Sequence, residues 1–167
     1  MSYVCFVLIY PVLIFCALKN GAAPVTMALL LSLIVAVSFF CKRQLLPTLG
    51  GIALIVLTLL FKDAVFAKLY PVLINSVFFI LFTSSLKGKP LAQLFAEKIE
   101  PNLSEEKKIY TRKVTIAWSL FLLFNLTLSF LTLFASDEVW VLYNGFVSYI
   151  LIGLMFASEY FIRRRCF

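Results

Sequence analysis

Three asparagines are the side chains of this sequence best placed for polar chemistry, because each lies inside a long apolar run. Asn75 and Asn125 stand near the middle of two successive runs, and Asn144 lies early in the next one. An amide within a membrane costs free energy unless it finds a hydrogen-bonding partner. We therefore expect Asn75 and Asn125 to meet at similar depth. Two roles stay open: packing between helices, and lining a polar cavity for a substrate headgroup.

Two charged residues and two prolines complete the set of unusual positions in these runs. Glu159 precedes Arg163 by one helical turn, which predicts an ion pair that anchors a helix end. Lys68 lies near one end of its run, where its long side chain can extend to the headgroups. Pro11 and Pro71 each interrupt a helix and predict a kink.

The composition removes most enzymatic chemistry. The chain has no histidine, which excludes imidazole acid–base catalysis and the zinc and haem sites that use this ring. The four cysteines show no CxxC spacing, and no carboxylate cluster or nucleophile–base pair is visible. We expect no metal and no cofactor. An enzyme acting on acyl or isoprenoid substrates is accordingly the weakest hypothesis.

The elements that must position the asparagines are transmembrane helices. Hydrophobic residues make up 63% of the chain and charged residues 14%, far from the composition of a soluble domain. Six continuous apolar runs predict six helical spans in an all-α bundle that forms one integral membrane domain over residues 1–167. The first three runs are short, so five spans are the alternative. The runs cover residues 3–18, 24–40, 45–61, 64–86, 114–135 and 139–162.

The basic residues orient these spans. The formal net charge is +7, and most Lys and Arg residues fall in alternate connections, which predicts that both termini and the segment 87–113 are cytoplasmic. Because the basic residues adjoin apolar runs, we expect anionic lipid headgroups as partners and no nucleic acid. Trp118 and Trp140 are expected in interfacial belts on opposite sides of the membrane.

The segment 87–113 has its own organisation. Leu91, Leu94, Phe95 and Ile99 recur at helical spacing, which predicts a short amphipathic helix in the headgroup region. Ser104 is the expected N-cap of the next helix. The basic residues near the inner leaflet are candidate headgroup ligands, and a topology signal without a specific ligand is the simpler interpretation. These candidates are Lys107, Lys108, Arg112, Lys113, Arg163, Arg164 and Arg165.

Several short motifs of the sequence recur in an order that is typical of a known family. The stretch LTLLF at residues 57–61, followed by Asp63, Phe66, Lys68 and Pro71, resembles the LTLxF…D…FxKxKP pattern of the intracellular septation protein A family of bacterial inner-membrane proteins. Three shorter matches follow in order, namely KPL at 89–91, AW at 117–118 with Phe121, and WV at 140–141 with Tyr143.

The chain also departs from that family. Tyr70 and Asn144 replace lysines, and the insertion between Ala96 and Lys113 is longer and more charged. These departures indicate a sister group, similar to small membrane proteins encoded beside aryl-polyene and fatty-acid-like biosynthesis genes.

The resemblance implies an inner-membrane protein with a part in envelope maintenance or septation, and it implies no catalytic residues. Our first hypothesis is therefore a protein that acts by binding other envelope proteins and anionic lipid. The alternative is a small transporter or lipid-handling protein, with a polar path at the three asparagines and a homo-oligomer as a further expectation.

Overall fold

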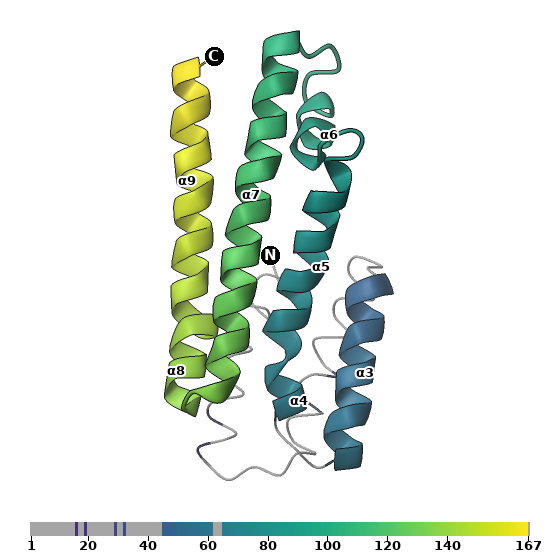
Figure 1. Cartoon of the computed structure of the whole chain (residues 1–167), viewed down its shortest axis with the longest axis vertical. Coiled ribbons are helices and arrows are strands. Elements are labelled where there is room, and N and C mark those ends of the chain that lie inside the picture. Colours follow the sequence, from purple (N-terminus) through teal and green to yellow (C-terminus); the bar gives the residue numbers. More distant parts are fainter. Residues whose placement is uncertain are drawn as a thin grey trace.

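The computed structural model describes residues 45–61 and 65–166, together with Cys16, Lys19, Leu29 and Ser32. All the elements assigned within these residues are helices (Figure 1). The first two expected spans, residues 3–18 and 24–40, lie outside the described residues apart from those single positions, and so does Pro11. The following account concerns the part of the chain from residue 45 onward.

The third apolar run forms helix α3 (Leu45–Phe61), with the bounds that the sequence predicts. It packs against the short helix α4 (Val65–Lys68) and against α5 (Tyr70–Ser85). Thr58 on α3 is fully buried, and its hydroxyl donates to the Leu54 carbonyl at 2.7 Å. This bond satisfies a polar side chain within an apolar contact surface.

Helices α4 and α5 form one rod with a break at Leu69. Pro71 stands in the first turn of α5, where its missing N–H removes no bond that the turn requires. The expected interruption at this proline is therefore present, and it takes the form of a new helix start after a short helix.

A compact connection leads from α5 to the longest helix. The short helix α6 (Leu91–Glu97) forms where the amphipathic pattern predicts it. Helix α7 (Glu105–Leu131) then begins at Ser104, whose side chain accepts from the Lys107 N–H at 3.4 Å and confirms the expected N-cap. A single 3₁₀ turn, η1 (Thr132–Phe134), ends this rod.

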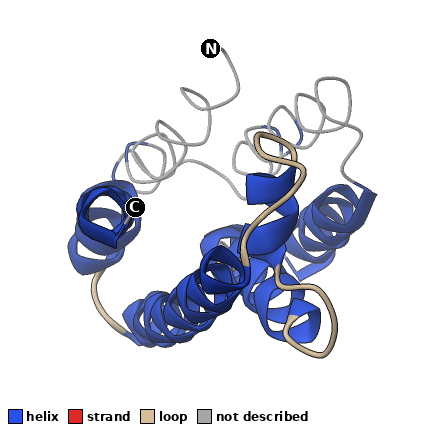
Figure 2. Ribbon diagram, turned by 90° about the horizontal axis from the view of Figure 1, so that it is seen from above, coloured by secondary structure: helices blue, strands red, loops and turns tan. Residues whose placement is uncertain are grey.

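The last apolar run is helical in three pieces. Helix α8 (Asp137–Leu142) begins at the N-cap Ser136, a π-helical turn η2 (Tyr143–Val147) follows, and α9 (Ser148–Cys166) is the last described element. Helices α5, α7 and α9 share the long axis of the molecule, and α6 lies beside the N-terminal end of α7 (Figure 1). Seen from above, the helix that carries the C-terminus stands at one side of the group (Figure 2).

Three helical rods in the described part of the chain are long and apolar enough to cross a membrane. They are Val65–Ser85, Glu105–Phe134 and Asp137–Arg165. The apolar stretch of α3 is shorter, at Gly51–Phe61. The protein is thus a helical membrane protein, and the total of six spans and the cytoplasmic position of both termini stay predictions.

The outward face of α7 is apolar and its inward face is polar. Ile116, Leu120 and Phe124 are exposed, whereas a row of small polar residues is buried against the neighbouring elements, α5 foremost. Small side chains let two membrane helices approach closely, and their hydroxyls bond within the helix. The buried polar row consists of Thr111, Thr115, Ser119, Asn125 and Ser129 on α7, and Thr132 in η1 continues it.

Trp140 lies in the bundle core, and its expected place in an interfacial belt is wrong. The side chain is 0% exposed and packs with Leu54, Ala67 and Tyr70. Its position in the first turns of α8 places it against α3, α4 and α5, which fold over that end of the last rod. Burial of a large ring in this cluster outweighs the interfacial preference of tryptophan.

Candidate functional site

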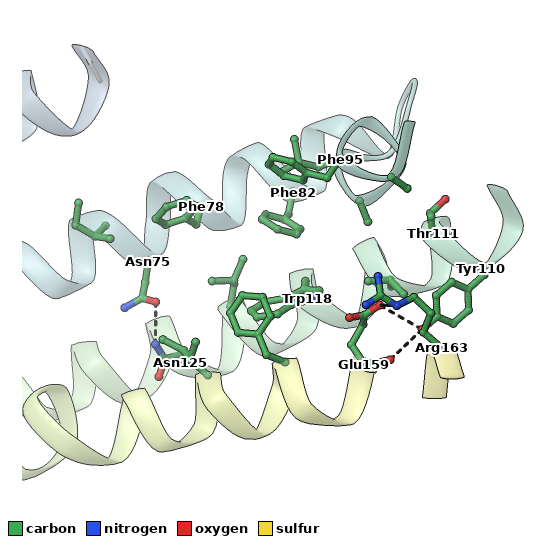
Figure 3. A pocket seen from close by; sticks show the side chains of 18 of the residues that line it. Asn75, Phe78, Phe82, Phe95, Tyr110, Thr111, Trp118, Asn125, Glu159 and Arg163 are labelled. Carbon is green, nitrogen blue, oxygen red and sulfur yellow. Dashed lines mark hydrogen bonds and ion pairs between the residues drawn. The ribbon is translucent and has the colours of Figure 1, made fainter. Parts of the chain in front are cut away.

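Asn75 and Asn125 are hydrogen bonded across α5 and α7. The Asn125 Nδ2 donates to the Asn75 Oδ1 at 2.8 Å, which confirms the expected meeting of the two amides (Figure 3). The Asn75 Nδ2 in turn donates to the Pro71 carbonyl at 2.9 Å. The Tyr143 hydroxyl donates to the Asn125 Oδ1 at 2.6 Å, so this network joins three helical rods.

Asn144 lies beside this network and is 3% exposed. Its Nδ2 donates to the Thr132 Oγ1 and to the Trp140 carbonyl, both at 3.0 Å. Its Oδ1 is buried and has no hydrogen-bond partner among the residues that the structure describes. The third predicted asparagine therefore joins the site with one acceptor atom unused.

A cavity of about 800 Å³ connects these amides with the other end of the bundle. Its walls come from α5, α6, the segment between α6 and α7, α7, η2 and α9, and α9 makes few contacts with α7. Figure 3 shows the asparagine pair at one end, a series of aromatic rings in the middle and charged side chains at the other end. We call these ends the deep end and the mouth. The aromatic wall consists of Phe78, Phe82, Phe95, Trp118 and Phe156.

Trp118 links two sides of the cavity. Its ring centroid lies 6.1 Å from that of Phe82 on α5 and 4.7 Å from that of Phe156 on α9. Such ring pairs add to the free energy of burial. Because Trp118 lines the middle of the cavity, its fluorescence can report an alkyl chain of a ligand that enters there.

The mouth is lined by charges of both signs that pair with each other. The predicted pair is present, with the Arg163 Nε 3.7 Å from the Glu159 Oε1. The Tyr110 hydroxyl donates to the Glu159 backbone carbonyl at 3.3 Å, which connects α7 to α9. Lys107 forms a second pair with Glu100 at 2.6 Å. The mouth thus presents two neutralised pairs.

Helix α6 forms one wall beside the mouth through Leu91, Ala92, Phe95 and Ala96. The C-terminal end of α6 is held by Glu97, whose carboxylate accepts hydrogen bonds from the Lys89 Nζ at 2.6 Å and from the Gln93 Nε2 at 2.8 Å. These two hydrogen bonds, that of Lys89 foremost, lower the pKa of Glu97 from its usual 4.5. The Thr115 hydroxyl also accepts from the Ala92 N–H at 3.2 Å, which attaches α6 to α7.

Lys68 does not line the cavity, and the expectation that it extends outward is wrong. The residue is 9% exposed and forms an ion pair with Asp137 at the start of α8. The break after α4 places its ammonium against that turn. Pairing offsets the cost of burying the charge, so Lys68 joins two rods at the end of the molecule opposite the mouth.

The seven basic residues predicted to bind headgroups divide into two sets. Lys107, Lys108 and Arg163 pair with carboxylates of neighbouring residues, and Arg112 donates to the Leu86 carbonyl at 3.2 Å. The second set consists of Lys113, Arg164 and Arg165, which are exposed, with the Arg164 guanidinium 5.1 Å from the centre of the Tyr160 ring. Attraction to anionic headgroups therefore stays a prediction for this second set in particular.

Two functional features were missed at the sequence level. The buried polar row is visible as two groups of small polar residues, 111/115/119 and 125/129/132, each spaced by three or four positions, a signal typical of close helix packing. The contribution of Tyr143 had no such signal. It depends on the π-helical turn that carries the residue, and no spacing in the sequence announces this turn.

Comparisons of the chain with protein-family models, with curated proteins and with solved structures found no match. The class of protein is therefore described from its fold and its site alone. It is a helical membrane protein in which an apolar cavity extends from a buried amide network to a charged mouth.

Proposed function

We propose that this protein binds a long-chain amphiphile between α5, α7 and α9, as a lipid-handling protein of the bacterial inner membrane. The cavity of about 800 Å³ carries the proposal, because its size falls within the range of ligand pockets. Its apolar middle and polar ends match the two parts of an amphiphile. Each methylene group that leaves water for such a wall contributes about 0.8 kcal/mol.

The length of the cavity supports a lipid chain as the ligand. At about 1.5 Å per residue, the part of α7 between Tyr110 and Asn125 is roughly 22 Å long. One leaflet contributes about half of a hydrocarbon core of about 30 Å. A chain from one leaflet therefore fits between the mouth and the deep end, with room for a polar group.

This proposal reverses the order of the two hypotheses from the sequence. The cavity and its amides favour lipid handling over binding of protein partners alone. The part in envelope maintenance or septation that the resemblance implies is kept as a prediction, and it is compatible with lipid handling because an envelope protein works among lipids.

Quenching of Trp118 tests the proposal. Bromine atoms quench tryptophan on contact, so palmityl alcohol brominated at mid-chain should quench wild-type protein in phosphatidylcholine nanodiscs in a saturable manner. Ala96→Phe adds a ring to the cavity wall. It should weaken the probe's apparent affinity about tenfold or more, because the ring fills space that the alkyl chain of the probe needs.

Ala157→Phe is the matched control, because Ala157 is exposed on α9 and does not line the cavity. This variant should bind the probe as the wild type does. Equal quenching in wild type and Ala96→Phe, with both proteins folded by circular dichroism, would contradict the proposal.

A further inference from the structure

Arg163 is a cation of the cavity mouth whose hydrogen-bond donors the protein leaves unused. Its Nε lies 3.7 Å from the Glu159 Oε1, a distance that permits attraction between the charges but is too long for a hydrogen bond. Among the residues that the structure describes, none accepts a hydrogen bond from this guanidinium. Its planar fork of N–H groups is therefore available at the entrance to the cavity (Figure 3).

Lys107, the other cation that lines the mouth, is already engaged. Its Nζ donates to both carboxylate oxygens of Glu100, at 2.9 and 2.6 Å. These bonds tie the first turns of α7 to the segment that precedes this helix. The two lining cations therefore differ: Lys107 closes a contact within the protein, and Arg163 offers donors to a ligand.

The end of the molecule that carries the mouth has an excess of positive charge. Residues 87–113 and 159–165 lie at this end (Figure 1), and together they contain ten Lys or Arg residues and five Asp or Glu residues. The charged residues of the lining are balanced, so the excess comes from the residues around them. Such attraction extends over about 8 Å at physiological salt, and it favours an anionic group at the mouth.

The deep end suits the tail of a ligand better than a charged headgroup. Its neutral polar groups on Asn75, Asn125 and Tyr143 already bond to one another, and the charged residues of the described lining all belong to the mouth. A charge buried there without a partner is costly. A lipid of one leaflet also has its headgroup at the membrane surface, so a ligand with its headgroup at the mouth keeps the direction that it has in the bilayer.

From these observations we infer that the cavity binds a long-chain amphiphile with an anionic headgroup, a phosphate or a carboxylate, whose oxygens accept hydrogen bonds from the Arg163 guanidinium. The headgroup lies at the mouth, and the chain extends along the aromatic wall towards the deep end. A guanidinium suits both headgroups because its parallel N–H bonds fit two oxygens at once. The inference rests on the proposed function and adds the class of headgroup and the direction of the ligand.

Two probes with the same chain test the inference in the full-length protein in phosphatidylcholine nanodiscs. Hexadecyl phosphate and palmityl alcohol, both brominated at mid-chain, differ only in the headgroup. At equal mole fractions in the nanodisc, the wild type should bind the phosphate about tenfold more tightly than the alcohol by quenching of Trp118, because only the phosphate forms charge-assisted hydrogen bonds. Arg163→Gln should lose this preference and keep its affinity for the alcohol.

Arg165→Gln is the matched control. It removes the same charge from the same end of α9, but Arg165 is exposed and does not line the cavity. This variant should keep the preference for the phosphate. If it loses the preference as fully as Arg163→Gln does, the attraction belongs to the charge of the whole surface and the inference is overturned.

Inorganic phosphate distinguishes a lipid headgroup from a free anion as the source of the bound group. Compared with sodium chloride at the same ionic strength, it should leave the quenching by hexadecyl phosphate unchanged, because the free ion lacks the chain that fills the cavity. Displacement of the probe by inorganic phosphate would assign the Arg163 site to the free ion and overturn the inference.

Equal saturable quenching by both probes in the wild type would overturn the inference and leave the proposed function standing. A preference for the phosphate that persists in folded Arg163→Gln would do the same. If neither probe quenches Trp118, both the inference and the proposed function fall.

Discussion

The deep end and the mouth of the cavity both contain hydrogen bonds between side chains, yet these bonds differ in environment. At the deep end, neutral amides and a phenol bond to each other, and Asn125 is 1% exposed. At the mouth, charged groups pair where they are partly exposed, as in the Arg163–Glu159 pair. Water screens and replaces the second kind of bond but not the first. The hydrogen bonds between neutral groups at the deep end should therefore contribute more to the free energy of unfolding than the ion pairs at the mouth.

Asn125→Leu should have the largest effect. The substitution removes the partner of both Asn75 and Tyr143, and should lower the free energy of unfolding by about 1–3 kcal/mol. Reversible unfolding in mixed micelles with increasing SDS measures the change. Thr127→Val, on the exposed face of the same helix, should change it by less than about 0.5 kcal/mol.

A double-mutant cycle of Asn75→Leu and Asn125→Leu isolates the bond between the two amides. Its coupling energy should lie near 0.6 kcal/mol, the average for interhelical hydrogen bonds in membranes. Strictly additive effects would show that the two amides contribute independently.

Tyr143→Phe should have the second largest effect. It keeps the ring and removes only the hydroxyl that donates to the Asn125 Oδ1, so about 1 kcal/mol of stability should be lost. The same SDS titration measures it. A change as small as that of a surface substitution would mean that the deep end is as well solvated as the mouth.

Glu159→Gln should have a small effect on stability, at most about 0.5 kcal/mol, because the Arg163 side chain is half exposed and solvent screens the pair. The difference between wild type and variant should shrink further when unfolding is measured at high salt. A loss as large as that of Asn125→Leu would remove the contrast between the two ends.

The pH dependence at α6 should be the smallest effect. Folding lowers the pKa of Glu97, so its bonds to Lys89 and Gln93 stabilise α6 above pH 4.5 and are lost as the pH falls through the folded pKa. Wild type should show greater amide-exchange protection in α6 than Glu97→Gln at pH 7, and this difference should shrink steadily as the pH falls below 4.5. A difference that does not change with pH below 4.5 would assign the protection to another group.

The sequence predicted those features that depend on one helix or on neighbouring helices. The bounds of α3 follow from an uninterrupted apolar run, and the cap at Ser104 follows from local chemistry. The meeting of Asn75 and Asn125 follows from their equal depth in successive antiparallel runs.

The remaining features depend on how far apart helices lie and on which face each presents. Apolar composition predicts burial equally for a residue that faces lipid and for one inside the bundle, so the core position of Trp140 was missed. The cavity requires α9 to stand away from α7. The wider π-helical turn at Tyr143–Val147 changes the direction in which every later side chain of this rod points. A hydropathy profile does not predict such a turn.

The polar row on the inward face of α7 has a consequence for biogenesis. A newly inserted α7 that is alone in the bilayer exposes hydroxyls and the Asn125 amide to acyl chains, and only a neighbouring helix can cover them. Helix α5 precedes α7 along the chain, packs against it and supplies the partner of Asn125. We therefore expect α5 and α7 to leave the insertion machinery as a paired hairpin, to which the last rod is added afterwards.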